Sequence, residues 1–184
     1  DMMLDECAKS IFERRTKAVE QLLPLVERYY ALLSSDRERI GMQYRSDLQE
    51  GTMADMLLAS RRKDFINEHT TVGVHRDDVI FTIAEYPLRK FGSQGQQKSF
   101  LVALKLAEYT LLAEHNNEKP ILLLDDLFDK LDMGRVAQLL RLVGSEMFGQ
   151  IFITDCNKHR LQRTLSEAGA EYKLFTIAEG KHHE

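Results

Sequence analysis

The chain has 184 residues, of which 43% are hydrophobic, enough for one or two domains with a real core. Its formal net charge of −4 excludes a globally basic surface, so any contact with nucleic acid has to be local. The two cysteines, Cys7 and Cys156, show no metal-ligand spacing and suit a reducing cytoplasm. No apolar run approaches the roughly 20 residues that span a membrane, so we expect no membrane partner.

The first part of the chain, to about residue 70, is predicted to be mainly helical. Apolar residues recur at helical spacing from Leu4 to Leu33, and Pro24 should kink or break this helix near Leu23. Because the pattern is already under way at the first residue, we expect the chain to be a segment of a longer protein. Alternation of apolar residues from Ile40 to Tyr44 then predicts a short strand.

A second helix is predicted to begin after Thr52, which forms a capping box with Asp55, and to run to about Asn67. It carries the basic triplet Arg61, Arg62 and Lys63. Such a triplet is usually a solvated face; the alternative is that these side chains contact DNA phosphates.

The block Gly73–Asp78 combines a histidine, an arginine and two acids, and precedes a strand predicted from the alternation of Val79, Phe81 and Ile83. One interpretation is a turn in which Arg76 pairs with a neighbouring acid on the surface. The other is a site, because the block offers both charge signs and a titratable ring. Its role stays open.

A small polar loop at Phe91–Phe100 leads directly into a helix predicted to extend through Ala113. A loop that opens a helix presents free backbone N–H groups and the positive end of the helix dipole, which suits a phosphate. Ser93 adds a hydroxyl donor, and Gly95 allows the backbone to approach closely. The simpler alternative is an ordinary helix cap.

Four apolar residues, Ile121–Leu124, predict a strand that is buried on both faces, as in a parallel sheet. Two carboxylates, Asp125 and Asp126, follow at once. A strand of this kind delivers its acids to the crevice where α/β sheets bind ligands. A solvated loop is the alternative.

The remaining elements repeat the alternation of helix and strand. A helix is predicted from Val136 to Met147, and a second buried strand over Gln150–Thr154 is followed by Asp155. The next helix carries His159 as a surface residue. A final strand is predicted over Tyr172–Ala178, ahead of a charged tail whose adjacent histidines make a poor metal site.

Three blocks in this order are similar to motifs of ABC-type ATPase heads. Gly92–Ser99 resembles their signature loop, Ile121–Asp126 resembles their Walker B strand, and Phe128–Asp132 resembles the D-loop. The double aspartate and the Ser-Gln-Gly-Gln-Gln run, together with Gly73–Asp78, resemble the RecF family of bacterial recombinational repair proteins, which is related to SMC heads. The resemblance extends from about residue 71 to the end of the sequence.

The resemblance implies an α/β fold. Residues 71–184 would form the carboxyl-terminal part of an ABC-type P-loop ATPase head, and residues 1–70 a mainly helical lever subdomain. The sequence has no Gly-x-x-x-x-Gly-Lys-Ser/Thr motif, whose backbone would cradle the phosphates of ATP. In the family this Walker A motif lies in the amino-terminal half. We therefore expect the chain to be a carboxyl-terminal half that neither binds nor hydrolyses ATP alone.

The resemblance also implies roles for the acids in the complete protein. Asp125 would hold Mg²⁺, and Asp126 would take the place of the glutamate that polarises the attacking water in ABC heads. Those heads commonly carry a switch histidine where this chain has Asp155. Asp155 would either orient the attacking water or serve as an ordinary cap or loop acid.

The signature loop is implied to act across a dimer. Ser93, Gly95 and Gln96 would contact the γ-phosphate of ATP held by a second subunit, and Asp132 of the D-loop would lie across the same interface. ATP would thus hold a homodimer together, and hydrolysis would release it.

The implied function is that of a slow, DNA-dependent ATPase in DNA replication, recombination and the SOS response. It would clamp double-stranded DNA at gaps and junctions and promote recombinase loading with recombination mediator proteins. Two alternatives remain open. One is the head of another SMC-like or overcoming-lysogenisation-type ATPase, and the other is a non-catalytic scaffold that keeps the fold for interaction only.

Overall fold

The computed structural model describes residues 2–35, 38–125, 131–169, 171–178 and 181–183. In this part of the chain the helices are α1 (Met2–Ser34), α2 (Met53–Asn67), α3 (Leu88–Phe91), α4 (Gln94–Asn116), α5 (Met133–Val143) and α6 (Lys158–Glu167). Two short 3₁₀ turns are η1 (Asp47–Gln49) and η2 (Val74–Arg76). The strands are β1 (Ile40–Arg45), β2 (Asp78–Ile83), β3 (Tyr86–Pro87), β4 (Leu122–Leu124), β5 (Ile151–Ile153), β6 (Thr176–Ala178) and β7 (Lys181–His183).

Helix α1 is unbroken over its 33 residues, with Pro24 inside it. The expected break at Pro24 is therefore wrong, whereas a kink near Leu23 stays a prediction. Proline removes one backbone hydrogen bond, to the carbonyl of Glu20, but both residues are exposed and water can satisfy that carbonyl. The residues that follow Pro24 are anchored by burial of Val26, Tyr29 and Tyr30, and this packing holds the helix together.

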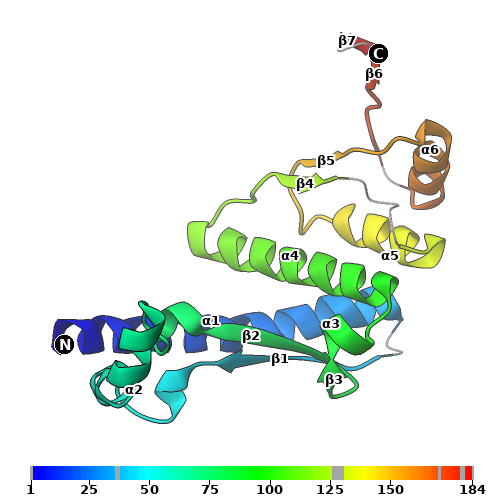
Figure 1. The fold of residues 1–184 in the computed structure, drawn as a ribbon. Coiled ribbons are helices and arrows are strands. Elements are labelled where there is room, and N and C mark those ends of the chain that lie inside the picture. The colour runs from blue at the N-terminus through cyan, green and yellow to red at the C-terminus, as the bar shows by residue number, and fades with distance from the viewer. Residues whose placement is uncertain (1, 36–37, 126–130, 170, 179–180, 184) are drawn as a thin grey trace.

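The predicted strands in the first half of the chain are confirmed as one antiparallel sheet. β1 pairs with β2 in a register that sets Ile40 opposite Ile83 and Arg45 opposite Asp78, and β2 continues into the short strand β3. The sheet lies beside α1 (Figure 1). Thr52 caps α2 as predicted, because its side chain accepts a hydrogen bond from the backbone N–H of Asp55.

The core lies between three helices. Helix α1 packs along α4, and α5 joins them (Figure 1). Tyr29 of α1, Leu106 of α4 and Leu139 of α5 are each 0% exposed. The hydroxyls of Tyr29 and Thr110 lie 2.6 Å apart and share a hydrogen bond between α1 and α4.

The predicted boundary between residues 1–70 and 71–184 separates elements that pack together in the structure. β1 pairs with β2 across it, and α1 shares its core with α4. The division into a lever and a head stays a prediction. The structure adds that the carboxyl-terminal end of α1 is built into the same core as α4.

The second sheet pairs β4 with β5 in parallel, with Leu122 opposite Ile151 and Leu124 opposite Ile153. The expectation that β4 is buried on both faces is wrong for this chain. Leu122 is buried, but Leu123 is 71% exposed and Phe152 on β5 is half exposed. In the described part of the chain this sheet has two strands, and one of its faces has no covering layer.

Two further boundaries differ from the sequence prediction. Helix α5 ends at Val143, ahead of Met147, because Gly144, a poor helix former, follows. Of the strand predicted over Tyr172–Ala178, only β6 (Thr176–Ala178) forms. It pairs with β7, which places His182 and His183 in a strand instead of a tail. Residues 171–175 alternate in sequence, yet they do not form a strand, because alternation alone does not supply the hydrogen bonds of a sheet.

None of the helices in the described ranges combines the length and the apolar character needed to cross a membrane.

Truncating the fully buried side chain of Leu106 to alanine should destabilise the chain by roughly 2 to 5 kcal/mol, because a cavity opens between α1, α4 and α5. Leu112→Ala on the same helix is the matched control, since Leu112 is 46% exposed and should cost only about 0.5 kcal/mol. Urea unfolding followed by circular dichroism measures both. Equal losses for the two variants would contradict this core.

Candidate functional site

The carboxyl ends of β4 and β5 lie at one edge of the sheet because the two strands are parallel. Asp125 follows β4 directly and is exposed at this edge. The Thr154 hydroxyl, at the end of β5, donates a hydrogen bond to Oδ1 of Asp125, and the Thr154 backbone N–H donates to the carbonyl of Leu124 at 2.9 Å. The Asp125 carboxylate is therefore held by the neighbouring strand and still open to solvent.

Residues 126–130 lie outside the described part of the chain, so the structure places neither Asp126 nor most of the D-loop. Asp132 at the end of that loop is described. It caps α5, because its Oδ1 accepts a hydrogen bond from the backbone N–H of Arg135 at 2.9 Å.

The residues at this edge fit a magnesium ion that arrives with a nucleotide. Among the residues that the structure describes, no three histidine, cysteine or acidic side chains are grouped to hold a metal by themselves. Mg²⁺ in nucleotide sites commonly uses one or two carboxylates and completes its shell with phosphate oxygens and water. The exposed carboxylate of Asp125 supplies one oxygen donor of this kind.

Helix α4 begins at Ser93 with a complete capping box. The Ser93 hydroxyl oxygen accepts a hydrogen bond from the Gln96 backbone N–H at 3.2 Å, and the Ser93 backbone N–H donates to Oε1 of Gln96 at 2.7 Å. Ser93 is exposed, and its cap uses the hydroxyl only as an acceptor, so the O–H remains a donor for a ligand. Gly92 is required before it, because a Cβ there would lie 2.7 Å from the Leu88 carbonyl oxygen.

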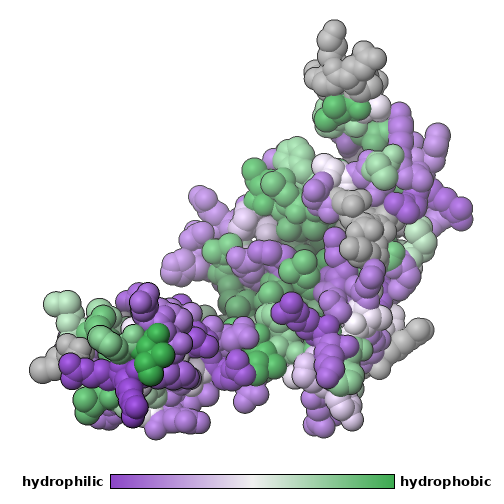
Figure 2. All heavy atoms as spheres, viewed as in Figure 1, coloured by the Kyte–Doolittle hydropathy of each residue, from purple (hydrophilic) through white to green (hydrophobic). Residues whose placement is uncertain are grey.

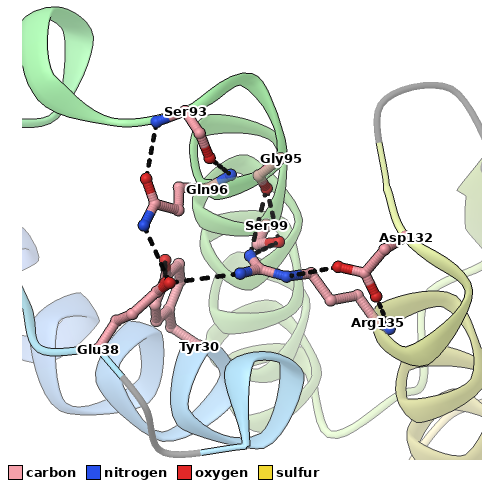
Figure 3. Close-up of polar contacts among 8 residues, drawn as sticks. All are labelled: Tyr30, Glu38, Ser93, Gly95, Gln96, Ser99, Asp132 and Arg135. Carbon is pink, nitrogen blue, oxygen red and sulfur yellow. Dashed lines mark hydrogen bonds and ion pairs between the residues drawn. The ribbon is translucent and has the colours of Figure 1, made fainter.

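Gln96 points away from the loop surface. Besides accepting from Ser93, its amide nitrogen donates to Oε1 of Glu38 at 2.9 Å (Figure 3). Both ends of this side chain are thus engaged within the chain, and nucleotide contact by Gln96 stays a prediction. Gly95 lies in the first turn of α4, where its carbonyl accepts from the Ser99 hydroxyl at 2.8 Å.

Sequence reasoning missed the residue at the centre of this region, Arg135 of α5 (Figure 3). Its side chain is only 17% exposed. One terminal nitrogen donates to the Ser99 hydroxyl at 2.7 Å and to the Gly95 carbonyl at 3.4 Å. The other lies 3.5 Å from Oε1 of Glu38, and Nε lies 3.1 Å from Oδ2 of Asp132. One guanidinium therefore joins three segments that are far apart in sequence.

Glu38 is the acidic centre of the same network. Its second carboxylate oxygen accepts a hydrogen bond from the hydroxyl of Tyr30 on α1. Burial alone would raise the pKa of Glu38, but hydrogen bonds from Tyr30 and Gln96 and the charge of Arg135 hold it below its usual value. Burial, followed by the hydrogen bond to Glu38, raises the pKa of Tyr30 above its usual range. At neutral pH, Glu38 is therefore an anion and Tyr30 a donor.

Asp155 lies on the same sheet edge but turns its side chain inward, where it is 0% exposed. Its Oδ1 accepts from the Asn157 backbone N–H at 2.6 Å, and its Oδ2 lies 3.5 Å from Arg160. This geometry is that of a loop acid, while a part in orienting water stays a prediction. His159 is exposed on α6, as expected.

The block Gly73–Asp78 is organised around a buried carboxylate. Asp77 is 3% exposed and pairs with Arg15 of α1 at 2.7 Å, and it accepts from the hydroxyl of Tyr44 on β1 at 2.5 Å. The surface pairing with Arg76 considered as one interpretation is therefore wrong for Asp77. Gly73 has φ +117°, and a Cβ there would meet the Met53 side chain at 2.4 Å. The block ties α1, β1 and α2 together.

The basic triplet Arg61, Arg62 and Lys63 is exposed on α2. Helix α2 is docked at the amino-terminal end of α1, where Oδ1 of Asp5 accepts a hydrogen bond from the Ala54 backbone N–H at 3.2 Å (Figure 1). The triplet is thus separated from the Ser93 loop by the length of α1, and a DNA contact there stays a prediction.

No protein-family model matches the chain. The chain is 39% identical over 178 residues to the DNA replication and repair protein RecF of Bacteroides thetaiotaomicron, which covers 97% of this chain and 48% of that protein. It is 41% identical over 181 residues to the protein of the same name from Parabacteroides distasonis, covering 98% of this chain and 50% of that protein.

Solved structures of the recombination mediator protein RecF of the RecFOR pathway share the fold. The structure of RecF-ATPrS has a TM-score of 0.71 at 26% identity and covers 96% of this chain and 47% of that chain. The structure of RecF-ATP has a TM-score of 0.69 at 28% identity and covers 85% of this chain and 43% of that chain.

These similarities confirm the predicted fold class, part of an ABC-type ATPase head with a helical portion ahead of it. The chain spans about half the length of the curated relatives it matches. With this identity along nearly all of its length, the chain belongs to the RecF family of DNA replication and repair proteins.

Proposed function

We propose that the chain supplies the signature, Walker B and D-loop half of an ATP-dependent DNA-binding protein. The complete protein is this chain joined to the rest of a RecF-length sequence. It dimerises on ATP at gapped or junction DNA and promotes recombinase loading together with mediator proteins. The observation that carries the proposal is the exposed, capped start of α4 at Ser93, fixed through Arg135 to the cap of α5 at Asp132.

The uncovered face of the β4–β5 sheet supports a head that is completed by another part of the protein. Ile121, Leu123 and Phe152 are exposed there, and apolar side chains gather over β4 and α4 in Figure 2. Apolar groups of this size are normally removed from water. Further strands and a covering layer from the other half, which would also carry the Walker A loop, would bury them.

In this proposal each side chain has a chemical task. The γ-phosphate of ATP held by the partner subunit contacts the Ser93 hydroxyl and the backbone around Gly95. Gln96 is a predicted additional contact. Asp125 would hold Mg²⁺, which would neutralise charge on the phosphates. Asp126 orients the attacking water, and because aspartate is short the expected turnover is slow.

The remaining assignments follow the family. Arg61, Arg62 and Lys63 are proposed to contact DNA phosphates, since they are exposed and basic on an overall acidic chain. Asp132 is proposed to face the partner subunit, and Asp155 to occupy the switch position. Cys7 and Cys156 are both unpaired and exposed, which suits the cytoplasm that we propose as the compartment.

The proposal predicts that this chain alone does not bind Mg-ATP, whereas the complete protein does. Isothermal titration calorimetry on both, under the same buffer and at the same protein concentration, measures the difference. Heat of binding from the complete protein only, followed by ATP-dependent dimerisation on gapped DNA, would support a split head. Tight binding by the chain alone would contradict it, and would mean that Ser93–Lys98 does not act in trans.

A further inference from the structure

The network around Arg135 joins the two loops that the proposed function places against the partner's nucleotide. Through Ser99 and the Gly95 carbonyl it holds the first turns of α4, directly below the Ser93 cap. Through Asp132 it holds the start of α5, where the D-loop ends. A planar guanidinium with five donors in a fixed fork is suited to set such a mutual orientation.

The same network reaches the end of α1. Glu38 lies between α1 and β1, and it is bound by Tyr30 of α1, by Gln96 of the capping box and by Arg135 (Figure 3). Because Gln96 also holds the Ser93 backbone N–H, a chain of direct contacts runs from Tyr30 to Ser93. A shift of α1 relative to α5 cannot occur without disturbing these contacts.

The charges in this network are paired at low exposure, which makes it sensitive to change. The Glu38 side chain is 22% exposed and the Arg135 side chain 17%. Removing one partner of a partly buried, hydrogen-bonded pair leaves the other charge without full compensation. The network therefore fixes specific segments relative to one another. The exposed pair of Lys105 and Glu108 on α4 does not do so.

We propose that Arg135 and Glu38 are positioning residues that lock the signature loop, the D-loop and the end of α1 into one unit. This inference rests on the proposed function, because it assumes that Ser93 and Asp132 meet a nucleotide held by the partner. The unit lets the orientation of α1 determine whether both loops fit that nucleotide. Neither residue touches the nucleotide itself.

Arg135→Lys in the complete protein tests this inference, because lysine keeps the charge and loses the fork. ATP binding to the monomer should be unchanged, since the other half of the head holds the nucleotide. Dimerisation on Mg-ATP should weaken about tenfold, and turnover should fall about 10- to 100-fold through misplacement of the loops. Arg141→Lys, at an exposed position of the same helix, is the matched control.

Glu38→Gln provides an independent second variant with nearly the same shape. It should also weaken ATP-dependent dimerisation while leaving ATP binding close to wild type, and its melting temperature should fall by a few degrees because Arg135 keeps Asp132 but loses the charge of Glu38. Calorimetry, analytical ultracentrifugation with Mg-ATP and thermal unfolding provide these three readouts. If ATP binding falls in parallel with dimerisation in Glu38→Gln, the role is merely structural and the inference is overturned.

The failure of the inference is distinguishable from failure of the proposed function. Wild type and Ser93→Asp are run in the same dimerisation assay. If wild type does not dimerise on Mg-ATP, the proposed function fails, and the inference that rests on it fails too. If wild type dimerises, Ser93→Asp does not, and both Arg135→Lys and Glu38→Gln match wild type, only the inference is overturned.

Discussion

Replacing Ser93 by aspartate should abolish ATP-dependent dimerisation of the complete protein and leave its fold intact. Aspartate caps a helix as well as serine does, so the hydrogen bond from the Gln96 backbone N–H and the start of α4 should be retained. Its carboxylate would, however, face the γ-phosphate of the partner's ATP. Repulsion between two like charges about 4 Å apart costs a few kcal/mol in a partly solvated site, which corresponds to about a 100-fold weaker dimer for each nucleotide.

Sedimentation with and without Mg-ATP measures this effect, and Ser93→Thr is the matched control because it keeps both the cap and the hydroxyl. Thermal unfolding and ATP titration of each variant separate a folding defect from a dimer defect. A Ser93→Asp protein that dimerises like wild type would show that this loop does not meet the nucleotide.

Asp126→Asn should trap the ATP-bound dimer of the complete protein. If Asp126 polarises the attacking water, the asparagine amide that replaces its carboxylate cannot act as the base. Hydrolysis should therefore fall about 10²- to 10⁴-fold. Dimerisation on ATP should persist, because neither the signature loop nor the magnesium site is altered. Phosphate release measures turnover, and dimer lifetime follows from dilution after ATP loading.

Asp125→Asn, at the adjacent residue, is the comparison that separates magnesium binding from activation of the water. Asp125 is proposed to hold Mg²⁺, so this change should weaken both hydrolysis and the dimer, and the dimer should not accumulate. The exposed carboxylate of Asp125 also accepts from Thr154, and an asparagine oxygen preserves that hydrogen bond. If Asp126→Asn dimers dissociate as fast as wild type, the role assigned to Asp126 is wrong.

The parts of the site that sequence reasoning could predict are those set by local pattern. The helix that begins after Ser93 was predictable because a polar loop with a capping residue runs into helical apolar spacing. The edge with Asp125 was predictable because a short apolar strand ends in acids. Both depend on neighbours within a few residues, where propensity and capping dominate.

The parts that could not be predicted depend on contacts between distant segments. Glu38 and Arg135 are 97 residues apart, and nothing near Glu38 marks it as the partner of an arginine on α5. The available signal was weak: Arg135 stands one turn before buried Leu139, on the same face of its helix. An arginine on an apolar face is a candidate for a specific pair.

The two wrong expectations about burial and continuity have the same origin. Pro24 opposes a helix locally, but the buried side chains of α1 outweigh it. The Ile121–Leu124 run indicates burial on both faces, yet Leu123 is exposed, because what covers a strand is decided by the rest of the protein and not by the strand. Local sequence reports the preference of a segment, and tertiary contacts decide whether it is met.

The unbroken α1 connects the Tyr30–Glu38 contact near one end to the docking point of α2 near the other. At 1.5 Å per residue, its 33 residues extend about 50 Å, so a tilt of about 6° at one end displaces the other end by about 5 Å. Tyr30 is bound to Glu38 near one end, and Asp5 holds α2 with its basic triplet at the other. On the proposal that this triplet contacts DNA phosphates, a small tilt of α1 at the Tyr30–Glu38 contact would shift the triplet relative to those phosphates by several ångströms.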